Sequence, residues 1–483
     1  MKPIEVLAVA SEFYPLIKTG GLADVAGALP GALKPHGVTV TTLLPGYPAV
    51  LAKLEGAEQV WGWVNLFGGT ARLVAGRAGG APLLVLDAPH LYRRPGNPYL
   101  DGAGQDWADN PMRFAALARV GAELASGLRP GWRPDVVHGH DWQAGLLPAY
   151  LHFWGDRSTL GHTTPPSVMT IHNLAFQGIF AAGLLGTLGL PSDAYDLEAL
   201  EYYGSISFLK AGIRLADRVT TVSPTYAREI RTPAGGMGLD GLLQARGEAV
   251  RGILNGIDTE VWDPATDTAL AETYSAGAPD GRAANKAALC ARFGLDPSRL
   301  LFGVVSRLTT QKGLDLLPAA LPTIRALGGA TVILGAGAPE LERAFAEAAR
   351  PGEMGLYLGY DEALAHLIYA GADALLIPSR FEPCGLTQLC AMRYGCIPVV
   401  TRAGGLADTV IDANEAALAA GVATGFQMEA ADPAALDLAL HRAAAVWREP
   451  SLWARMQQNA MAADVGWGRS AGQYAALYRE LIG

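Results

Sequence analysis

The sequence predicts an α/β protein in which two Rossmann-like, doubly wound domains face one cleft. Short apolar runs rich in β-branched residues recur along both halves of the chain, and helical patterns follow most of them. Strands that are apolar along their whole length are typical of parallel sheets covered by helices on both faces. A chain of 483 residues is also too long for a single hydrophobic core.

The predicted strands form two series, one in each half of the chain. In the first half they are Ile4–Ala10, Val38–Leu44, Pro82–Leu86, Asp135–His138, Ser167–Ile171 and Arg218–Val222. In the second half they are Leu300–Val305, Ala330–Leu334, Leu356–Gly359, Ala372–Ile377 and Ile397–Val400. Each series alternates with helical patterns, which indicates two separate doubly wound sheets.

A turn-rich stretch near residues 245–260 separates the two series, because Gly247–Gly256 leads into the turn residues Asp258–Pro264. We therefore expect an N-terminal domain over residues 1–247 and a C-terminal domain over residues 248–455. From about Pro450 the pattern is helical and carries aromatic residues that need a surface to bury against, namely Trp453, Trp467, Tyr474 and Tyr478. Residues 456–483 are expected to form a C-terminal helix.

The charge and the distribution of polar residues argue against nucleic-acid binding, a signal peptide and a membrane helix. The net charge of −9 argues against a broad nucleic-acid-binding surface. The chain begins Met-Lys-Pro-Ile-Glu and runs straight into a predicted strand, without the plan of a signal peptide. The longest stretch without Asp, Glu, Lys or Arg, Ser158–Ser192, contains prolines and polar residues that a membrane helix would not hold.

The four cysteines are Cys290, Cys384, Cys390 and Cys396, and their spacing matches neither a zinc site nor a small disulfide framework. Reduced thiols in a cytoplasmic protein are the simplest interpretation. Nothing in the sequence gives the oligomeric state.

The most informative segment is Ser379–Gln388, which follows the apolar run Ala374–Pro378. It places the Glu382 carboxylate and the Cys384 thiol at the carboxyl end of a predicted strand, where open α/β sheets bind ligands. Read alone, the segment leaves open whether Glu382 or Cys384 is a nucleophile.

Two cations follow the first strand of the second domain. Arg307 and Lys312 lie on the predicted strand-to-helix connection Val305–Gly313. Arg offers a planar fork to phosphate oxygens and Lys a point charge, so the pair suits a diphosphate. Solvated surface cations are the ordinary alternative, and the position at the ligand edge of the sheet weighs against it.

Two similar Gly-Gly loops, Lys18–Val25 and Arg402–Val410, each follow a predicted strand and open a helix. Backbone N–H groups at the positive end of a helix form a natural anion site. A tight turn explains either copy alone, but a cation ahead of the glycines in both copies favours anion binding.

Polar residues also end two strands of the first domain, in the segments His138-Gly139-His140-Asp141 and His172-Asn173. A metal site would need further ligands at a recognisable spacing, and none is evident. We therefore predict that Asp141 and a histidine line the cleft. Gly335-Ala336-Gly337 begins like a dinucleotide fingerprint, but Glu340 replaces the third glycine, which argues against NAD.

Together these motifs resemble the bacterial glycogen synthase family and its plant starch synthase relatives. The resemblance runs in order from the first strand to the last helix through Lys-Thr-Gly-Gly-Leu-Ala-Asp-Val, His-Asp-Trp, Ile-His-Asn-Leu-Ala-Phe-Gln-Gly, Val-Ser-Pro-Thr-Tyr-Ala-Arg-Glu-Ile, Leu-Asn-Gly-Ile-Asp, Ser-Arg-Leu-Thr-Thr-Gln-Lys-Gly and Pro-Ser-Arg-Phe-Glu-Pro-Cys-Gly-Leu-Thr-Gln. It implies the GT-B glycosyltransferase fold, with the C-terminal helix packing back on the first domain. It also implies retaining transfer of glucose from ADP-glucose to the non-reducing end of an α-1,4-glucan. We expect no metal or other cofactor if Arg307, Lys312 and helix N-termini stabilise the charge of the departing diphosphate.

The same resemblance implies roles for individual residues. It assigns the catalytic roles to Glu382, Arg307, Lys312, Asp141 and His172, with Glu382 orienting the glucose rather than attacking it. The residues that it assigns to ADP-glucose binding are Lys18, Gly20, Gly21, Asp24, Tyr99, Asn173, Cys384, Gly385, Leu386 and Thr387.

Other functions stay open at this point. A related enzyme of the same fold that uses UDP-glucose or another acceptor is the nearest alternative. A phosphorylase would need a lysine-bound pyridoxal phosphate. An inactive glucan-binding protein would be expected to lack Lys18, Arg307, Lys312 or Glu382, and all four are present.

Overall fold

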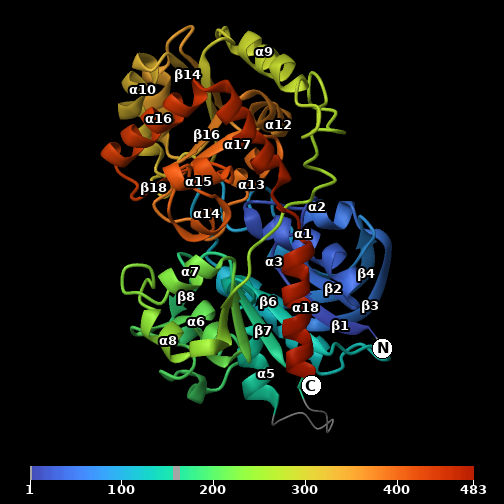
Figure 1. Cartoon of the computed structure of the whole chain (residues 1–483). Helices are drawn as coiled ribbons and strands as arrows, with labels where there is room; N and C mark the ends of the chain where they lie inside the picture. The colour runs from blue at the N-terminus through green and yellow to red at the C-terminus, as the bar shows by residue number, and fades with distance from the viewer. Residues whose placement is uncertain (1–2, 156–163) are drawn as a thin grey trace. The chain divides into compact units, whose positions relative to one another are not determined.

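The computed structural model describes residues 3–155 and 164–483, and its chain divides into two compact units. Unit 1 contains residues up to Asn255 together with Trp467–Gly483, and unit 2 contains Gly256–Gly466. Each unit has its own sheet with helices on both faces (Figure 1). The two doubly wound domains predicted from the sequence are therefore confirmed.

Unit 1 is built on a nine-stranded sheet, counted over its described residues, in the order β12-β11-β7-β6-β1-β2-β5-β4-β3. Its strands are β1 (Ile4–Val9), β2 (Val38–Pro45), β3 (Glu55–Leu66), β4 (Gly69–Ala78), β5 (Ala81–Asp87), β6 (Val136–His140), β7 (Ser167–Ile171), β11 (Arg218–Thr221) and β12 (Val250–Gly252). From β12 to β5 all neighbours are parallel. The chain leaves β1 toward β2 and later returns to its other side with β6, so the strand order reverses between β1 and β6.

The helices of unit 1 cover both faces of this sheet. They are α1 (Gly21–Leu33), α2 (Pro48–Ala52), α3 (Pro89–Tyr92), α4 (Asn110–Ala125), α5 (Leu147–Gly155), α6 (Phe208–Leu215), α7 (Pro224–Glu229), α8 (Asp240–Ala245) and α18 (Gly468–Ile482). The Val-Ser-Pro-Thr-Tyr motif begins α7. Ser223 caps the helix by accepting a hydrogen bond from the Tyr226 N–H at 2.8 Å, and Pro224 occupies the first turn.

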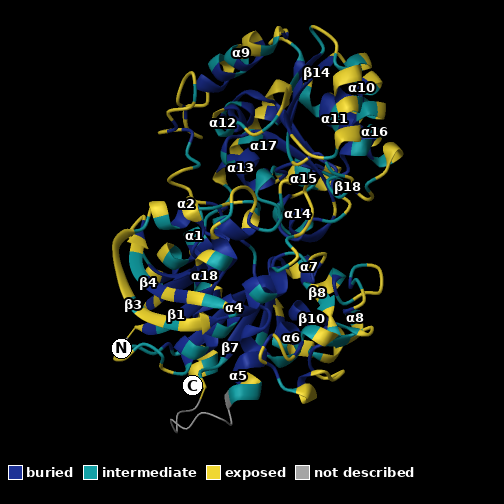
Figure 2. Ribbon diagram, turned by 180° about the vertical axis from the view of Figure 1, so that it is seen from behind, coloured by how far each residue is buried: buried dark blue, intermediate teal, exposed yellow. Residues whose placement is uncertain are grey.

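Two antiparallel elements of unit 1 were not predicted. Strands β3 and β4 form a hairpin at one edge of the sheet, and β3 is exposed along most of its length (Figure 2). A strand exposed on both faces lacks the apolar pattern by which strands are recognised. The second element is a small sheet in the order β8-β10-β9, formed by β8 (Ile179–Ala181), β9 (Glu201–Tyr202) and β10 (Ser205–Ser207).

Unit 2 is built on a six-stranded, wholly parallel sheet in the order β15-β14-β13-β16-β17-β18. The strands are β13 (Leu300–Val305), β14 (Gly329–Gly335), β15 (Met354–Leu358), β16 (Ala374–Ile377), β17 (Ile397–Thr401) and β18 (Phe426–Met428). The strand order reverses between β13 and β16. In open α/β sheets the ligand binds at the carboxyl ends of the strands at such a reversal.

The helices of unit 2 again flank the sheet, and apolar residues between them form a separate core. They are α9 (Gly281–Phe293), α10 (Leu317–Ala326), α11 (Pro339–Ala348), α12 (Glu362–Gly371), α13 (Thr387–Arg393), α14 (Gly404–Thr409), α15 (Glu415–Ala420), α16 (Pro433–Trp447) and α17 (Pro450–Ala462).

The helical pattern from Pro450 onward forms two helices in different units. Helix α17 stays in unit 2, where Trp453 packs on Phe426 with ring centroids 6.4 Å apart. Helix α18 belongs to unit 1 and contacts α1. Tyr474 and Tyr478 of α18 are buried in a cluster with residues of α1, β1 and β6, which gives these aromatics the surface that they require.

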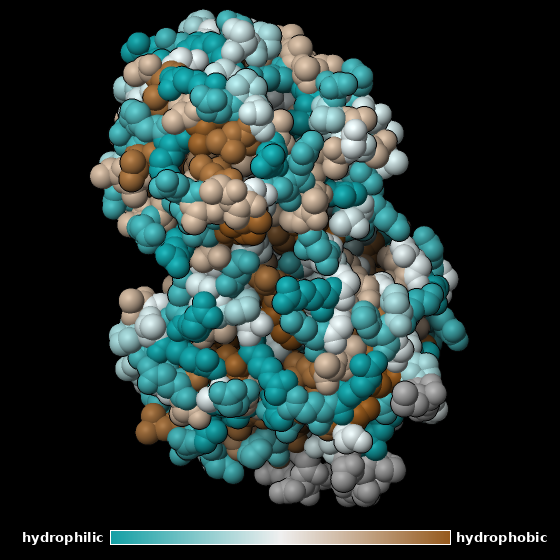
Figure 3. All heavy atoms as spheres, viewed as in Figure 1, coloured by the Kyte–Doolittle hydropathy of each residue, from teal (hydrophilic) through white to brown (hydrophobic). Residues whose placement is uncertain are grey.

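No helix among the described residues is long and apolar enough to cross a membrane. The face drawn in Figure 3 carries small apolar patches among hydrophilic residues. Residues 158–163 of the uncharged stretch Ser158–Ser192 lie outside the described residues, as do Met1 and Lys2.

Candidate active site

The strand-order reversal of unit 2 brings together two of the predicted catalytic residues. Lys312 follows β13 and Glu382 follows β16, and the Lys312 ammonium donates to the Glu382 carboxylate at 2.6 Å. The Ser379 hydroxyl donates to the same carboxylate oxygen at 3.0 Å. Glu382 is only 5% exposed, so its charge is compensated by these two donors rather than by water.

The loops that carry this pair are locked together by their backbones. Gly313 has φ +66°, and a Cβ at this position would lie 1.8 Å from the carbonyl oxygen of Pro378, so only glycine fits. The Arg380 N–H donates to the Gln311 carbonyl at 2.9 Å, and the Arg380 guanidinium binds Asp315 at 2.6 and 2.7 Å. These contacts fix the distance between the loop after β13 and the loop after β16.

Arg307 lies on the same loop as Lys312 and is exposed. Its guanidinium makes no hydrogen bond or ion pair with any residue in the described part of the chain, so its donors are available to a ligand. Gly335 and Gly337 pack against the backbone of this loop. A Cβ on Gly335 would lie 2.0 Å from the Ser306 carbonyl oxygen, and one on Gly337 would lie 2.2 Å from that of Leu308. Close backbone packing therefore accounts for the Gly-x-Gly sequence.

The turn from Cys384 to Thr387 presents its backbone N–H groups at the same edge. The Gln388 amide donates to the carbonyl oxygens of Cys384 and Gly385 at 3.0 and 2.9 Å, which holds the turn from beneath. The N–H groups of Gly385, Leu386 and Thr387 have no acceptor among residues 3–155 and 164–483. The Cys384 side chain itself is buried.

The second Gly-Gly loop, Gly404-Gly405, packs onto the backbone that carries Glu382. A Cβ on Gly404 would lie 1.8 Å from the Glu382 carbonyl oxygen, and one on Gly405 would lie 2.2 Å from that of Cys384. The Gly405 N–H donates to the carbonyls of Glu382 and Pro383 at 3.1 and 3.2 Å. The N–H on which the anion-site interpretation of this copy depends is therefore already bonded, and the glycines are explained by close packing.

In unit 1 the first Gly-Gly loop is organised by Glu12, a residue that the sequence analysis did not single out. The Glu12 carboxylate accepts hydrogen bonds from the Thr19 N–H, from the Thr19 hydroxyl at 2.6 Å and from the Gly20 N–H at 3.4 Å. It also accepts one from the Tyr99 hydroxyl at 2.5 Å. Glu12 could have been predicted from its position just after β1, because the other candidate residues also follow strands.

The remaining residues of this loop are more open. Lys18 forms an ion pair with Asp24 at 2.7 Å, and both side chains are partly exposed. Gly20 has an extended backbone, and a Cβ there would meet no atom within 4 Å. Gly21 begins α1 and is exposed. The local fold therefore does not require glycine at position 20.

Asp141 follows β6 at the strand-order reversal of unit 1 and has an unusual backbone, with φ +56°. Its carboxylate accepts hydrogen bonds from the backbone N–H groups of His172, at 2.7 Å, and Asn173, at 3.4 Å. These bonds bring three predicted site residues together. Burial raises the pKa of Asp141 from 3.8 to about 7, because two N–H donors compensate only part of the lost hydration.

His172 also contacts a second histidine. The His140 Nδ1 and the His172 Nε2 lie 3.0 Å apart, so one of the two rings donates to the other. His138 stacks on His140 and is bonded to Thr170 at 2.6 Å and to the Tyr478 hydroxyl of α18 at 2.8 Å. Burial lowers the pKa of all three histidines, that of His140 to about 4, so the rings are neutral near pH 7.

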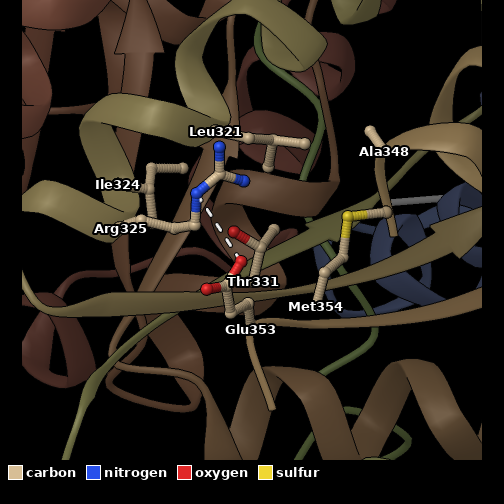
Figure 4. A pocket seen from close by; sticks show the side chains of 7 residues that line it. All are labelled: Leu321, Ile324, Arg325, Thr331, Ala348, Glu353 and Met354. Atoms are coloured by element: carbon tan, nitrogen blue, oxygen red, sulfur yellow. Dashed lines mark ion pairs between the residues drawn. The ribbon is translucent and has the colours of Figure 1, made fainter. Parts of the chain in front are cut away.

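Across the residues with described placement, no group of three or more His, Cys, Asp or Glu side chains is arranged to hold a metal ion. A small hollow in unit 2 is lined by Leu321, Ile324, Arg325, Thr331, Ala348, Glu353 and Met354 (Figure 4). It contains the Arg325–Glu353 ion pair and lies near the amino end of β15, and none of the predicted site residues lines it.

Comparisons with known proteins agree with this arrangement. Residues 5–245 match the family model described as starch synthase catalytic domain, and residues 287–460 match the model for glycosyl transferases group 1. Glycogen synthases from Rhodopseudomonas palustris and Methylocella silvestris are each 58% identical over 486 residues, which is 100% of this chain and 99% of each relative. The glycogen synthase of Acidiphilium cryptum is 58% identical over 99% of both chains.

Two solved structures have the same fold. The catalytic domain of starch synthase IV from Arabidopsis thaliana, bound to ADP and acarbose, has a TM-score of 0.89 and 34% identity, with 100% of both chains covered. A sucrose-phosphate synthase from Thermosynechococcus elongatus has a TM-score of 0.60 over 100% of this chain, and at 19% identity it supports the fold alone. The chain therefore belongs to the glycogen synthase family of GT-B glycosyltransferases.

Proposed function

We propose that this protein elongates α-1,4-glucans by transferring glucose from ADP-glucose to the non-reducing end of a chain, with retention at the anomeric carbon. The observation that carries the proposal is the Lys312–Glu382 pair at the strand-order reversal of unit 2, on the same loop as Arg307, whose guanidinium has no partner among the described residues. This arrangement offers positive charge to a diphosphate and a carboxylate to a sugar. Relatives of the same family are named glycogen synthases, and a related starch synthase was solved with ADP and acarbose.

Cleavage of the bond between glucose and the diphosphate leaves negative charge on ADP. We assign the stabilisation of this charge to Arg307 and Lys312, because preorganised donors at the site of developing charge lower the barrier without reorganisation. The N–H groups of Gly385, Leu386 and Thr387, which have no acceptor in the described part of the chain, supply further donors. The proposal needs no resident metal or cofactor, since these groups supply the positive field.

Glu382 is assigned to the hydroxyl groups of the transferred glucose. One of its oxygens already accepts from both Lys312 and Ser379, which makes that oxygen a weak nucleophile. Cys384 contributes its backbone, because its thiol is buried. In unit 1, Asp141, His172 and Asn173 are assigned to sugar binding, and Lys18, Gly20, Gly21, Asp24 and Tyr99 to the substrate as well.

Tyr360 extends the proposal to the nucleotide. It follows β15 at the carboxyl edge of the unit 2 sheet, next to the Gly335–Gly337 turn, where the Gly359 N–H donates to the Gly335 carbonyl at 2.9 Å. Its side chain is 76% exposed, and an exposed aromatic ring at this edge suits stacking on the adenine base. The four cysteines are buried and form no disulfide bond, and the cytoplasmic location expected from them is part of the same proposal.

The deciding experiment measures incorporation of glucose into glycogen from ADP-glucose and, separately, from UDP-glucose, in the presence of EDTA. We expect transfer from ADP-glucose, little transfer from UDP-glucose, and an α-1,4 linkage in the product by NMR. Preference for UDP-glucose would favour the related enzyme considered above, and transfer that stops in EDTA would contradict the assignment to Arg307 and Lys312.

A further inference from the structure

The hairpin between β9 and β10 has an unexpected residue at its tip. Tyr203 and Gly204 connect the two strands with φ +47° and +80°, so both central residues of the turn have left-handed backbones. Turns of this kind favour Asn, Asp or Gly at both positions. A bulky aromatic residue at the first position is an outlier that costs conformational free energy.

The Tyr203 side chain is also 81% exposed, so burial does not offset this cost. In the hairpin between β3 and β4, by contrast, partial burial of the aromatic ring offsets the cost of the left-handed backbone. Its tip is Phe67-Gly68, with φ +49° and +91°, and the Phe67 ring packs against the core of unit 1 with the Arg119 guanidinium 5.8 Å from its centroid. Tyr203 makes an edge contact with the ring of Tyr202, with ring centroids 4.8 Å apart, and its ring also lies beside Gly238.

The hairpin is tied to the segment that begins with His172 and Asn173. The Tyr202 hydroxyl and the Gln177 amide both donate to the Met237 carbonyl, at 3.0 and 2.9 Å. Strand β10 pairs with β8, which continues the same segment. Phe176, four residues after His172, is itself 51% exposed. Hydrogen bonds and strand pairing therefore connect the hairpin that carries Tyr203 to a segment of the candidate site.

We propose that Tyr203 is the stacking platform of an accessory site for an α-1,4-glucan. A glucose ring has an apolar C–H face that suits a flat aromatic ring, while the phenol hydroxyl can exchange hydrogen bonds with sugar hydroxyls. The inference rests on the proposed function, which gives the protein a polymeric acceptor longer than any single site. A second contact with the same polymer raises the local concentration of chain ends.

The test uses Tyr203→Asn, because Asn suits the left-handed turn while the ring is lost. Retardation of the full-length protein in native gels containing glycogen measures glucan binding without any donor. We expect the dissociation constant for glycogen to rise at least about threefold, through loss of the second contact. The Tm should be unchanged or higher, and kcat/KM for ADP-glucose with maltotriose as acceptor should be unchanged, because Tyr203 is not among the residues assigned to the catalytic site.

Two further variants separate the platform from general surface effects. Tyr203→Trp keeps an aromatic face and should keep wild-type retardation, and Val64→Asn removes an apolar side chain that is 90% exposed on β3 and should also leave it unchanged. Wild-type retardation by Tyr203→Asn, or a wild-type protein that glycogen does not retard, would overturn the inference. Glycogen binding that depends on Tyr203 without glucose transfer from ADP-glucose would support the site and contradict the proposed function instead.

Discussion

The two Gly-Gly loops have almost the same sequence but different structural roles. In Lys18–Asp24 the backbone N–H groups of Thr19 and Gly20 are bonded by the Glu12 side chain, and Gly20 has free space around it. In Arg402–Asp408 the Gly405 N–H is bonded by the backbone carbonyls of Glu382 and Pro383, and neither glycine has room for a Cβ.

The difference supports different proposed roles for the two glutamates. The Glu12 carboxylate accepts hydrogen bonds from Thr19 and Gly20, so we propose that Glu12 is a positioning residue. At the second loop the backbone of Glu382 does this work, which leaves the Glu382 carboxylate with Lys312 and Ser379 at the open edge of the sheet.

The largest effect is expected from placing a methyl group in each loop. Gly404→Ala would set a Cβ against the Glu382 carbonyl at a backbone φ of +42°, and we expect the free energy of unfolding to fall by roughly 3 kcal/mol or more. Gly20→Ala should change it by less than about 0.5 kcal/mol, because the site is open and the backbone extended. Urea unfolding measures both. Equal losses in the two variants would mean that the loops do not differ as described.

The next largest effects are expected from replacing Glu382 and Glu12, one at a time, with glutamine. Glu382→Gln should lower kcat about a hundredfold, or roughly 3 kcal/mol, by removing a charge that the transition state requires. Glu12→Gln should lower the free energy of unfolding by about 1–2 kcal/mol, because its charge-assisted hydrogen bonds become neutral. We expect kcat to fall much less in Glu12→Gln than in Glu382→Gln. Similar kcat values for the two variants would remove the distinction between them.

Asp141 extends the comparison to a buried carboxylate bonded by backbone N–H groups, and its effect depends on pH. Because its pKa is raised from 3.8 to about 7, the native protein keeps a proton that the unfolded chain releases above about pH 4. The contribution of Asp141 to the free energy of unfolding is therefore fully present at low pH and is lost as the pH rises from about 4 to about 7.

Asp141→Asn removes this titration and keeps an oxygen acceptor for the two N–H groups. Relative to wild type, the variant should therefore gain stability as the pH rises through this window, by up to about 1.4 kcal/mol per pH unit. Urea midpoints of both proteins between pH 5 and pH 7.5 test the prediction. Parallel curves would show that Asp141 is ionised in the native protein throughout this range.

The sequence predicted the buried part of the fold well and the exposed part poorly. Strands such as β7 and β13 were placed to the residue because parallel strands covered on both faces are apolar throughout. The β3–β4 hairpin was missed because its edge strand is exposed and has no apolar alternation. The break between α17 and α18 was missed because both helices are amphipathic and follow one another closely.

For the site, the sequence indicated which residues end strands but not how they are bonded. Lys312 and Glu382 were expected at one edge of the sheet. They are 70 positions apart in the sequence, and their ion pair forms because β13 and β16 are neighbours in the sheet. The role of Glu12 depends on the path of the loop, which returns to place Thr19 and Gly20 over its carboxylate. The tight packing of Gly404 on Glu382 is likewise a tertiary contact that no local pattern shows.

The most direct test of the account compares two cations at strand ends of unit 2, Lys312 and Arg402. Lys312 bonds the buried Glu382, whereas Arg402 is exposed and lies 3.5 Å from the exposed Glu429. With ADP-glucose and glycogen, we predict that Lys312→Ala lowers kcat about a hundredfold and that Arg402→Ala stays within about twofold of wild type. A Lys312→Ala variant that is folded and retains near-normal kcat would contradict the account.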